Sequence, residues 1–200
     1  MNNRINPPRL LGSRLAVDFA NASGSDAMSW AELVGFLEAV RIISAERAAR
    51  LLKLPDADLS TADSLLHKSR QLREALRTIF GAMARREKLS REWMGPINEV
   101  LRITEGHDEL VSREGRWQIE FVAREGGLDW LLAAIARSAA EIVAEGPNAR
   151  VRLCANPLCG LLFYDNSRTH RRRWCSMSVC GNRSKVAAFA KKHPLGSREE

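Results

Sequence analysis

The chain has 200 residues, of which 45% are hydrophobic and 28% charged, and its formal net charge at pH 7 is +7. This length suits one larger domain followed by a small module, and the apolar content excludes a disordered chain. No apolar run approaches the roughly 20 residues that span a bilayer, and the first residues lack the apolar core of a signal peptide, so we expect a cytoplasmic protein with no membrane partner.

The spacing of apolar residues predicts a mainly helical first domain. A short apolar stretch at residues 15–20 is compatible with a strand or with the first turn of a helix. Ser29 and Glu32 have the spacing of a capping box, and a helix from about residue 29 to 42 follows them. Four further helices are expected, at about residues 44–54, 60–88, 90–103 and 128–145.

Proline, glycine and a change of period mark the boundaries of these helices. Pro55 is expected to end the second helix, and Pro96 to bend or delay the fourth. Between residues 109 and 122 the apolar residues alternate, which predicts a β-hairpin. The segment Gly146–Asn148 stops the last of these helices. The longest helix is expected to bury one apolar face, made of Leu65, Leu72, Leu76, Ile79, Phe80 and Met83.

The predicted fold class is therefore mainly α with a small β-hairpin (α+β). Residues 1–147 would form a mostly helical regulatory or dimerisation domain, residues 150–193 a small module, and residues 194–200 a tail. The boundary is placed at the Gly-Pro-Asn segment because all the features described next follow it.

Four cysteines lie in the last quarter of the chain and none precedes them. Cys154 and Cys159 are separated by four residues, as are Cys175 and Cys180, with fifteen residues between the pairs. Two close pairs joined by a longer loop match the requirement of tetrahedral zinc, and disulfides are rare in the cytosol. We therefore predict one structural Zn²⁺ per chain.

Other uses of these cysteines are an iron–sulfur cluster, disulfides or free thiols. A catalytic zinc is disfavoured because four thiolates leave no open position for water or substrate. His170 is a conceivable ligand, but it stands among arginines and is more simply a surface histidine.

The segment between and around the pairs predicts a treble-clef-like zinc finger. Residues 151–153 and 161–165 can form the two arms of a hairpin, and residues 182–192 form a good helical run just after Cys180. In such a finger the knuckle, the hairpin and the helix start together hold the metal.

The positive charge is concentrated in the same module. Residues 1–150 hold 21 Lys and Arg and 21 Asp and Glu, whereas residues 151–200 hold 10 basic and 3 acidic residues. A solvated basic tail has this composition too, but its overlap with the cysteines favours a polyanion partner. The candidate nucleic-acid-binding residues are Arg168, Arg171, Arg172, Arg173, Arg183, Lys185, Lys191 and Lys192.

Two features limit how these residues could read a sequence. On a helix, Lys185 and Lys192 lie about 20° apart, while Arg183 and Lys191 point elsewhere, so the charge surrounds the helix and fits phosphate contacts better than base contacts. Trp174 could stack on a base, although a tryptophan beside a ligand cysteine is more often part of the core.

The motif Cys-Gly-Asn-Arg at residues 180–183, with Cys-Ala-Asn-Pro-Leu-Cys at 154–159 and Phe-Tyr-Asp at 163–165, resembles the CGNR zinc-finger family. In that family the finger follows an N-terminal domain called ABATE, whose start the segment at residues 15–21 resembles. The resemblance implies a stress-induced transcription regulator. Asp18 and Asn21 fall in this segment and could belong to a small-molecule site, but local capping of a turn is the simpler interpretation.

These observations favour a DNA-binding transcriptional regulator, with an unknown effector and a homodimer expected because so small a finger offers few base contacts. The alternative is a zinc-stapled module that binds protein or RNA. The sequence contains no nucleophile–base constellation, and no loop that would bind phosphate in an enzyme, so we expect no enzymatic activity.

Overall fold

The computed structural model describes residues 10–22, 28–103, 106–113, 116–123 and 127–192. The fold is mainly helical with two short antiparallel hairpins, as predicted. Its α-helices are α1 (Leu15–Asn21), α2 (Trp30–Ala39), α3 (Ala45–Leu52), α4 (Leu54–Ala57), α5 (Leu59–Arg85), α6 (Gly95–Ile103), α7 (Ala133–Ala144) and α8 (Asn182–Lys192). Its strands are β1 (Gly106–Arg113), β2 (Arg116–Ala123), β3 (Val151–Leu153) and β4 (Leu162–Tyr164).

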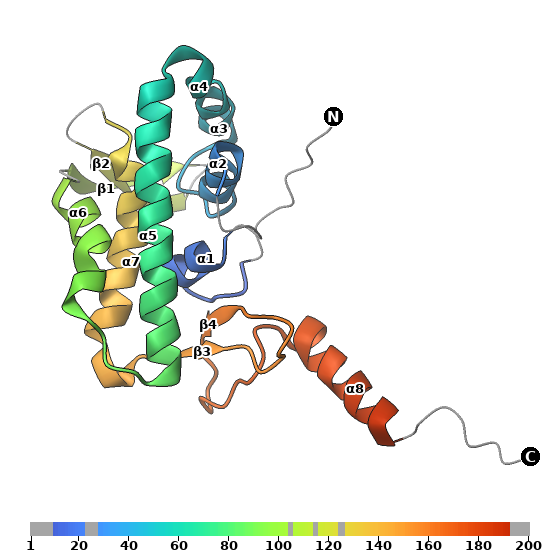
Figure 1. Cartoon of the computed structure of the whole chain (residues 1–200). Coiled ribbons are helices and arrows are strands. Elements are labelled where there is room, and N and C mark those ends of the chain that lie inside the picture. The colour runs from blue at the N-terminus through green and yellow to red at the C-terminus, as the bar shows by residue number, and fades with distance from the viewer. Residues whose placement is uncertain (1–9, 23–27, 104–105, 114–115, 124–126, 193–200) are drawn as a thin grey trace, which may run out of the picture.

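Helix α5 is the longest element of the described structure, and α1, α2, α4 and α6 pack against it (Figure 1). Its predicted apolar face is buried, except that Met83 is half-buried. Asp58 caps the start of the helix, where its carboxylate accepts a hydrogen bond from the Thr61 backbone. Arg86 follows the last helical residue in a left-handed conformation with φ of 59°. The segment at residues 15–21, ambiguous in sequence, is helix α1 and packs between α5 and α7.

The helix starts follow the local chemistry. Ser29 accepts a hydrogen bond from the Glu32 backbone at 3.2 Å and donates its own N–H to the Glu32 carboxylate at 2.8 Å, which confirms the capping box. The second predicted helix ends at Leu52, before Pro55, as expected. Pro55 itself lies in the first turn of α4, a short helix that the sequence pattern did not predict, where its missing N–H would have no partner within the helix. Pro96 delays the start of α6 behind a 3₁₀ turn, as predicted.

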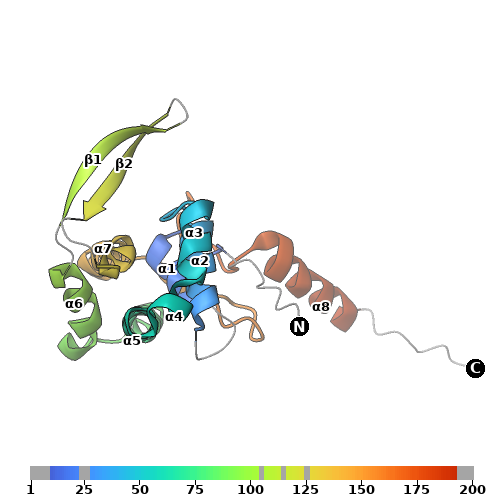
Figure 2. The same cartoon turned by 90° about the horizontal axis from the view of Figure 1, so that it is seen from above.

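The hairpin predicted near residues 109–122 is present and longer than expected. β1 pairs with β2 from Gly106 opposite Ala123 to Arg113 opposite Arg116. Figure 2 shows this hairpin extending away from the helices on the side opposite to α8.

The second hairpin packs against the helical domain. β3 and β4 pair with Val151 opposite Tyr164 and Leu153 opposite Leu162, so both predicted arms are confirmed. Val151, Leu162 and Tyr164 are buried in the same apolar core as α1, α5 and α7. The hairpin β3–β4 therefore shares the core of the helical domain across the predicted boundary at Gly146–Asn148, whereas the cysteines and Phe163 form a second cluster.

Within the described ranges, no helix is both long and apolar enough to cross a membrane.

Candidate metal centre and basic surface

The two cysteine pairs meet at one point. The Sγ atoms of Cys154, Cys159, Cys175 and Cys180 all lie within 4.8 Å of one another, and among the described residues this cluster contains no histidine or carboxylate. The first pair sits on the knuckle between β3 and β4. In the second pair, Cys175 precedes the π-helical turn Met177–Gly181 and Cys180 lies within it, just before α8. The predicted treble-clef-like order of knuckle, hairpin and helix is present.

The distances between the sulfurs fit zinc. Four thiolates at about 2.3 Å from a tetrahedral zinc lie about 3.8 Å from each other. The Sγ of Cys175 lies 3.6 Å from that of Cys159 and 3.8 Å from that of Cys180. A disulfide needs about 2 Å, so these thiols are not oxidised pairs. Three of the four cysteines are buried and the donor set is complete, which fits one structural Zn²⁺ and leaves no open position for catalysis.

The surroundings of the four thiols explain why this site needs a cation. Burial, and then the neighbouring thiols, raise the pKa of Cys175 far above the ordinary value. Burial also raises the pKa of Cys159. Burial acts to raise the pKa of Cys180, but the Asn156 amide and the neighbouring thiols hold this pKa below its usual value. Crowded thiolates without a counter-charge repel one another, and a divalent metal removes that repulsion.

The backbone around the sulfurs is fixed by local hydrogen bonds. In the first knuckle the Asn156 carboxamide accepts a hydrogen bond from the Leu158 backbone at 3.1 Å, and its Nδ2 lies 3.6 Å from the Cys180 sulfur. The Cys175 N–H donates to the Cys154 sulfur at 3.5 Å. Gly160, which follows the second ligand, has φ of +65°, a conformation that favours glycine. Asn156 thus both shapes the turn and reaches across to the other cysteine pair.

Arg172 turns inward and holds the metal module to the chain's beginning. Its guanidinium donates to the carbonyl of Trp174 at 2.9 Å, to the carbonyl of Cys175 and to the hydroxyl of Ser13 at 3.0 Å. It also stacks on the ring of the buried Phe163 at 4.7 Å. From its place in the basic run, Arg172 was predicted to be one of the nucleic-acid-binding arginines. The structure instead engages its guanidinium within the protein.

A fully buried carboxylate orders the loop between the hairpin and the second cysteine pair. Asp165 accepts hydrogen bonds from the backbone and hydroxyl of Ser167 and from the backbone of Arg172, and it lies 3.3 Å from the Arg152 guanidinium. Although burial opposes ionisation, these partners hold the pKa of Asp165 below its usual value. Asp165, the only acidic residue between residues 151 and 193, is therefore used within the protein to hold this loop.

Residues far apart in sequence bind the outer edge of β4. The Asn21 side chain donates to the Leu162 carbonyl at 2.8 Å and accepts from the Leu162 N–H at 3.0 Å. The Tyr164 N–H donates to the Gly12 carbonyl at 2.8 Å. Asn21 and Gly12 thus take the place of a neighbouring strand. This role of Asn21 was not predicted, because an asparagine in the sequence gives no sign of a hydrogen-bond partner 141 residues away.

Asp18 is buried and local, in agreement with the simpler interpretation of the sequence. Its carboxylate accepts a hydrogen bond from the Gly12 N–H at 2.6 Å. Burial raises its pKa to about 6, even though the Gly12 and Leu11 backbone groups act in the opposite direction. A Cβ at Gly12 would lie 2.8 Å from the Asp18 backbone nitrogen, so this close approach requires glycine. Asp18 therefore fixes the segment that Arg172 and β4 contact.

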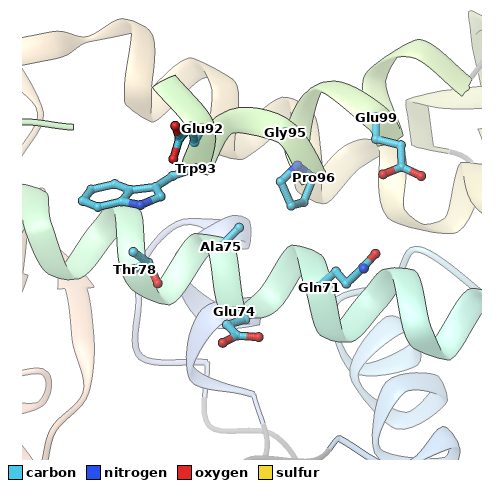
Figure 3. A pocket seen from close by; sticks show the side chains of 9 residues that line it. All are labelled: Gln71, Glu74, Ala75, Thr78, Glu92, Trp93, Gly95, Pro96 and Glu99. Atoms are coloured by element: carbon cyan, nitrogen blue, oxygen red, sulfur yellow. The ribbon is translucent and has the colours of Figure 1, made fainter. Parts of the chain in front are cut away.

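A surface groove of about 420 Å³ lies elsewhere, between α5 and α6 (Figure 3). Its lining includes Glu74, Glu92 and Glu99 with the indole of Trp93, and includes neither Asp18 nor Asn21. Three carboxylates make this face unsuited to nucleic acid. The groove is thus distinct from the metal module.

The other candidate basic residues of the module face solvent. Arg168, Arg171, Arg173, Arg183 and Lys185 are all exposed. The side chains of Lys191 and Lys192, at the end of α8, lie outside the described residues. Trp174 is half-buried against the cysteine cluster, with the Arg173 guanidinium 5.3 Å from its ring. His170 lies beside the Arg150 guanidinium at 2.7 Å and is not part of the cysteine cluster.

Comparison with known proteins identifies both parts of the chain. Residues 13–146 match the family described as "Putative stress-induced transcription regulator", ABATE, and residues 150–193 match the CGNR zinc finger. No curated protein matches the chain. Neither family description names a catalytic activity.

Proposed function

Because the chain belongs to the ABATE family and ends in a CGNR zinc finger, we propose that it is a cytoplasmic, DNA-binding transcriptional regulator in which zinc is structural. Residues 1–147 would act as the regulatory or dimerisation domain, and the finger at residues 150–193 would contact DNA. The observation that supports this proposal best is the outward orientation of the basic residues around a closed four-cysteine centre.

The finger's cations whose side chains the structure describes are of two kinds, and only the exposed kind is available to a phosphate backbone. Arg152 and Arg172 bind partners within the protein, as described above. Five others are exposed and would surround the metal site: Arg168, Arg171, Arg173, Arg183 and Lys185. The first domain, which holds 21 acidic residues in residues 1–150, adds no net charge. Nucleic acid would therefore approach the finger and not the helical domain.

In this proposal the four cysteines hold Zn²⁺, which supplies fold stability and no reaction step. Arg172 and Asn156 position the two cysteine pairs, and Asn21 attaches the hairpin to the helical domain. A signal received by residues 1–147 could therefore reach the finger through shared packing. Since a finger this small contacts few bases, we also propose that the protein binds its site as a homodimer.

The salt dependence of DNA binding tests the proposal. Each phosphate contact changes the slope of log affinity against log salt by about −0.9, so five exposed cations predict a slope of about −4.5 per chain. Lys185→Ala should weaken binding to all sequences alike and reduce the slope by about one unit. Lys53→Ala is the matched control, because this exposed lysine lies between α3 and α4, far from the finger (Figure 1).

The measurement is fluorescence anisotropy with labelled duplex DNA, from about 50 to 200 mM salt, a range over which such contacts change affinity strongly. If zinc-loaded protein does not bind DNA at about 50 mM salt, or binds it with an affinity that does not fall as the salt is raised, the regulator proposal fails. The finger would then be a protein- or RNA-interaction module.

A further inference from the structure

Helix α8 extends away from the rest of the molecule. In both views it points outward beyond the hairpin β3–β4, and its main packing partner is the turn Met177–Gly181 just before it (Figures 1 and 2). Arg183 and every residue from Lys185 to Ala190 are exposed. Isolated helices shorter than about 12–15 residues are marginal in water. A helix of 11 residues in this position would therefore gain stability by packing against a binding partner.

The exposed side chains of α8 include two large apolar ones. Val186 is 68% exposed and Phe189 is 66% exposed. They are three residues apart, so they lie on the same side of the helix, about 60° from each other. An apolar stripe directed at solvent in a helix that is otherwise small or charged indicates a surface that binds something.

Cations border this stripe on both sides. Around the helix axis, Arg183 lies about 60° from Val186 on the side away from Phe189. Lys185 lies on the other side, about 100° from Val186 and therefore just beyond Phe189. From their positions around the helix, these charges favoured phosphate contacts over base contacts. The exposure of Val186 and Phe189 adds an apolar strip between two positive borders.

The chemistry complementary to such a strip is an apolar floor between two rows of anions. The major groove of B-DNA is about 12 Å wide, which admits a helix, and thymine places its C5-methyl group on the floor between two phosphate backbones. The major groove of an RNA duplex is too narrow for side chains to read. We propose that α8 enters the major groove of duplex DNA, where Val186 and Phe189 contact thymine methyl groups while Arg183 and Lys185 bind the flanking phosphates.

This inference rests on the proposed DNA-binding function and specifies how bases would be recognised. Replacing thymine by uracil removes the methyl group and leaves the hydrogen-bonding edge and the phosphate charge unchanged. Burying one methyl group is worth about fourfold in affinity, so the loss of one or two such contacts predicts about four- to fifteenfold weaker binding.

The test compares two alternating 20-base-pair duplexes, one of adenine and thymine and one of adenine and uracil, with the full-length, zinc-loaded protein. Wild-type protein should prefer the thymine duplex by the stated factor. Val186→Ala and Phe189→Ala should each reduce this preference, and the double variant should remove it. Both residues are exposed on the helix, so the variants should keep their zinc and their fold.

Leu158→Ala provides the matched control. Leu158 is 94% exposed at the tip of the first knuckle, so this change removes an exposed apolar side chain of the same finger outside α8. It should leave the thymine preference unchanged, and Lys185→Ala should weaken binding to both duplexes equally.

The outcomes separate the two levels of the proposal. Equal binding of the thymine and uracil duplexes by wild-type protein would overturn the thymine contact while leaving DNA binding intact. Equal binding of an RNA duplex of the same length would show phosphate contact alone and would also overturn it. Absence of binding to either DNA duplex at low salt would instead refute the proposed function itself.

Discussion

Replacing Asn21 by alanine should destabilise the helical domain and the zinc finger together. The Asn21 carboxamide makes two hydrogen bonds with the backbone of Leu162, a buried residue of β4. In the variant the backbone N–H and carbonyl of Leu162 both lose their hydrogen-bond partner. A net hydrogen bond is worth about 0.5–1.5 kcal/mol, and a buried backbone group left unsatisfied costs about 1–3 kcal/mol. We therefore expect the free energy of unfolding to fall by about 2–4 kcal/mol, since Asn21 is half-buried and water can partly replace it.

The assay follows two signals in one urea titration. Helix content is measured by circular dichroism at 222 nm, and zinc release by a chromophoric chelator. Because Val151, Leu162 and Tyr164 belong to the helical core, the two transitions should coincide in wild-type protein. In the Asn21→Ala variant both should move to lower urea, and the midpoint of thermal unfolding should fall by roughly 5–15 °C.

Asn98→Ala is the matched control for this prediction. Asn98 is exposed on α6, so the same change of side chain should alter stability by less than about 0.5 kcal/mol. If Asn21→Ala behaves like Asn98→Ala, the attachment of β4 to α1 contributes nothing to stability. If zinc is released while helix content stays unchanged in wild-type protein, the finger and the helical domain do not fold as one unit.

Three further predictions concern the metal and the buried acid. Cys175→Ser should abolish tight zinc binding, measured by elemental analysis, while most of the helical signal remains, because α1, α2, α5 and α7 supply most of the core; loss of the whole signal would contradict this. Arg172→Ala should lower zinc affinity by about 10–100-fold in chelator competition, as expected for a group that positions ligands; unchanged affinity would assign Arg172 to another role. Burial raises the pKa of Asp18 from 3.8 to about 6. Between these two pH values the Asp18 carboxyl is protonated in the folded protein, whereas in the unfolded chain it is already ionised. Wild-type stability should therefore fall relative to the D18N variant by about 2–3 kcal/mol as the pH rises from about 4 to 7. A pH-independent difference in urea unfolding would refute this, and the comparison cancels the pH dependence of zinc binding, which both proteins share.

Local patterns in the sequence predict the elements of this fold well. The capping box at Ser29, the apolar face of α5 and the delay of α6 at Pro96 depend on residues within a few positions of each other, and the structure confirms each. The expected end of α3 before Pro55 was right, whereas the start of α4 at the same proline was missed. A proline that ends one helix is also well suited to the first turn of the next, and the local sequence indicates only the first of these roles.

The cysteine centre was predictable for a similar reason. Two closely spaced pairs of cysteines joined by a longer loop are typical of a tetrahedral zinc site, and the spacing Cys154–Cys159 and Cys175–Cys180 is itself the signal. The attachment of the finger to the helical domain was not predictable. It depends on Asn21 and Gly12 meeting β4, contacts that only the tertiary structure brings together.

The arginines of the finger show how such distant contacts change a functional argument. Arg171, Arg172 and Arg173 are consecutive and chemically identical, so a count of charges treats them alike. In the structure Arg171 and Arg173 are exposed, whereas Arg172 binds the carbonyls of Trp174 and Cys175 and the hydroxyl of Ser13. An arginine that satisfies backbone carbonyls next to a metal ligand would lose those bonds if it turned to a phosphate. The number of phosphates that the finger can neutralise is therefore smaller than its positive charge, and the measured salt slope should follow the exposed residues and not the total.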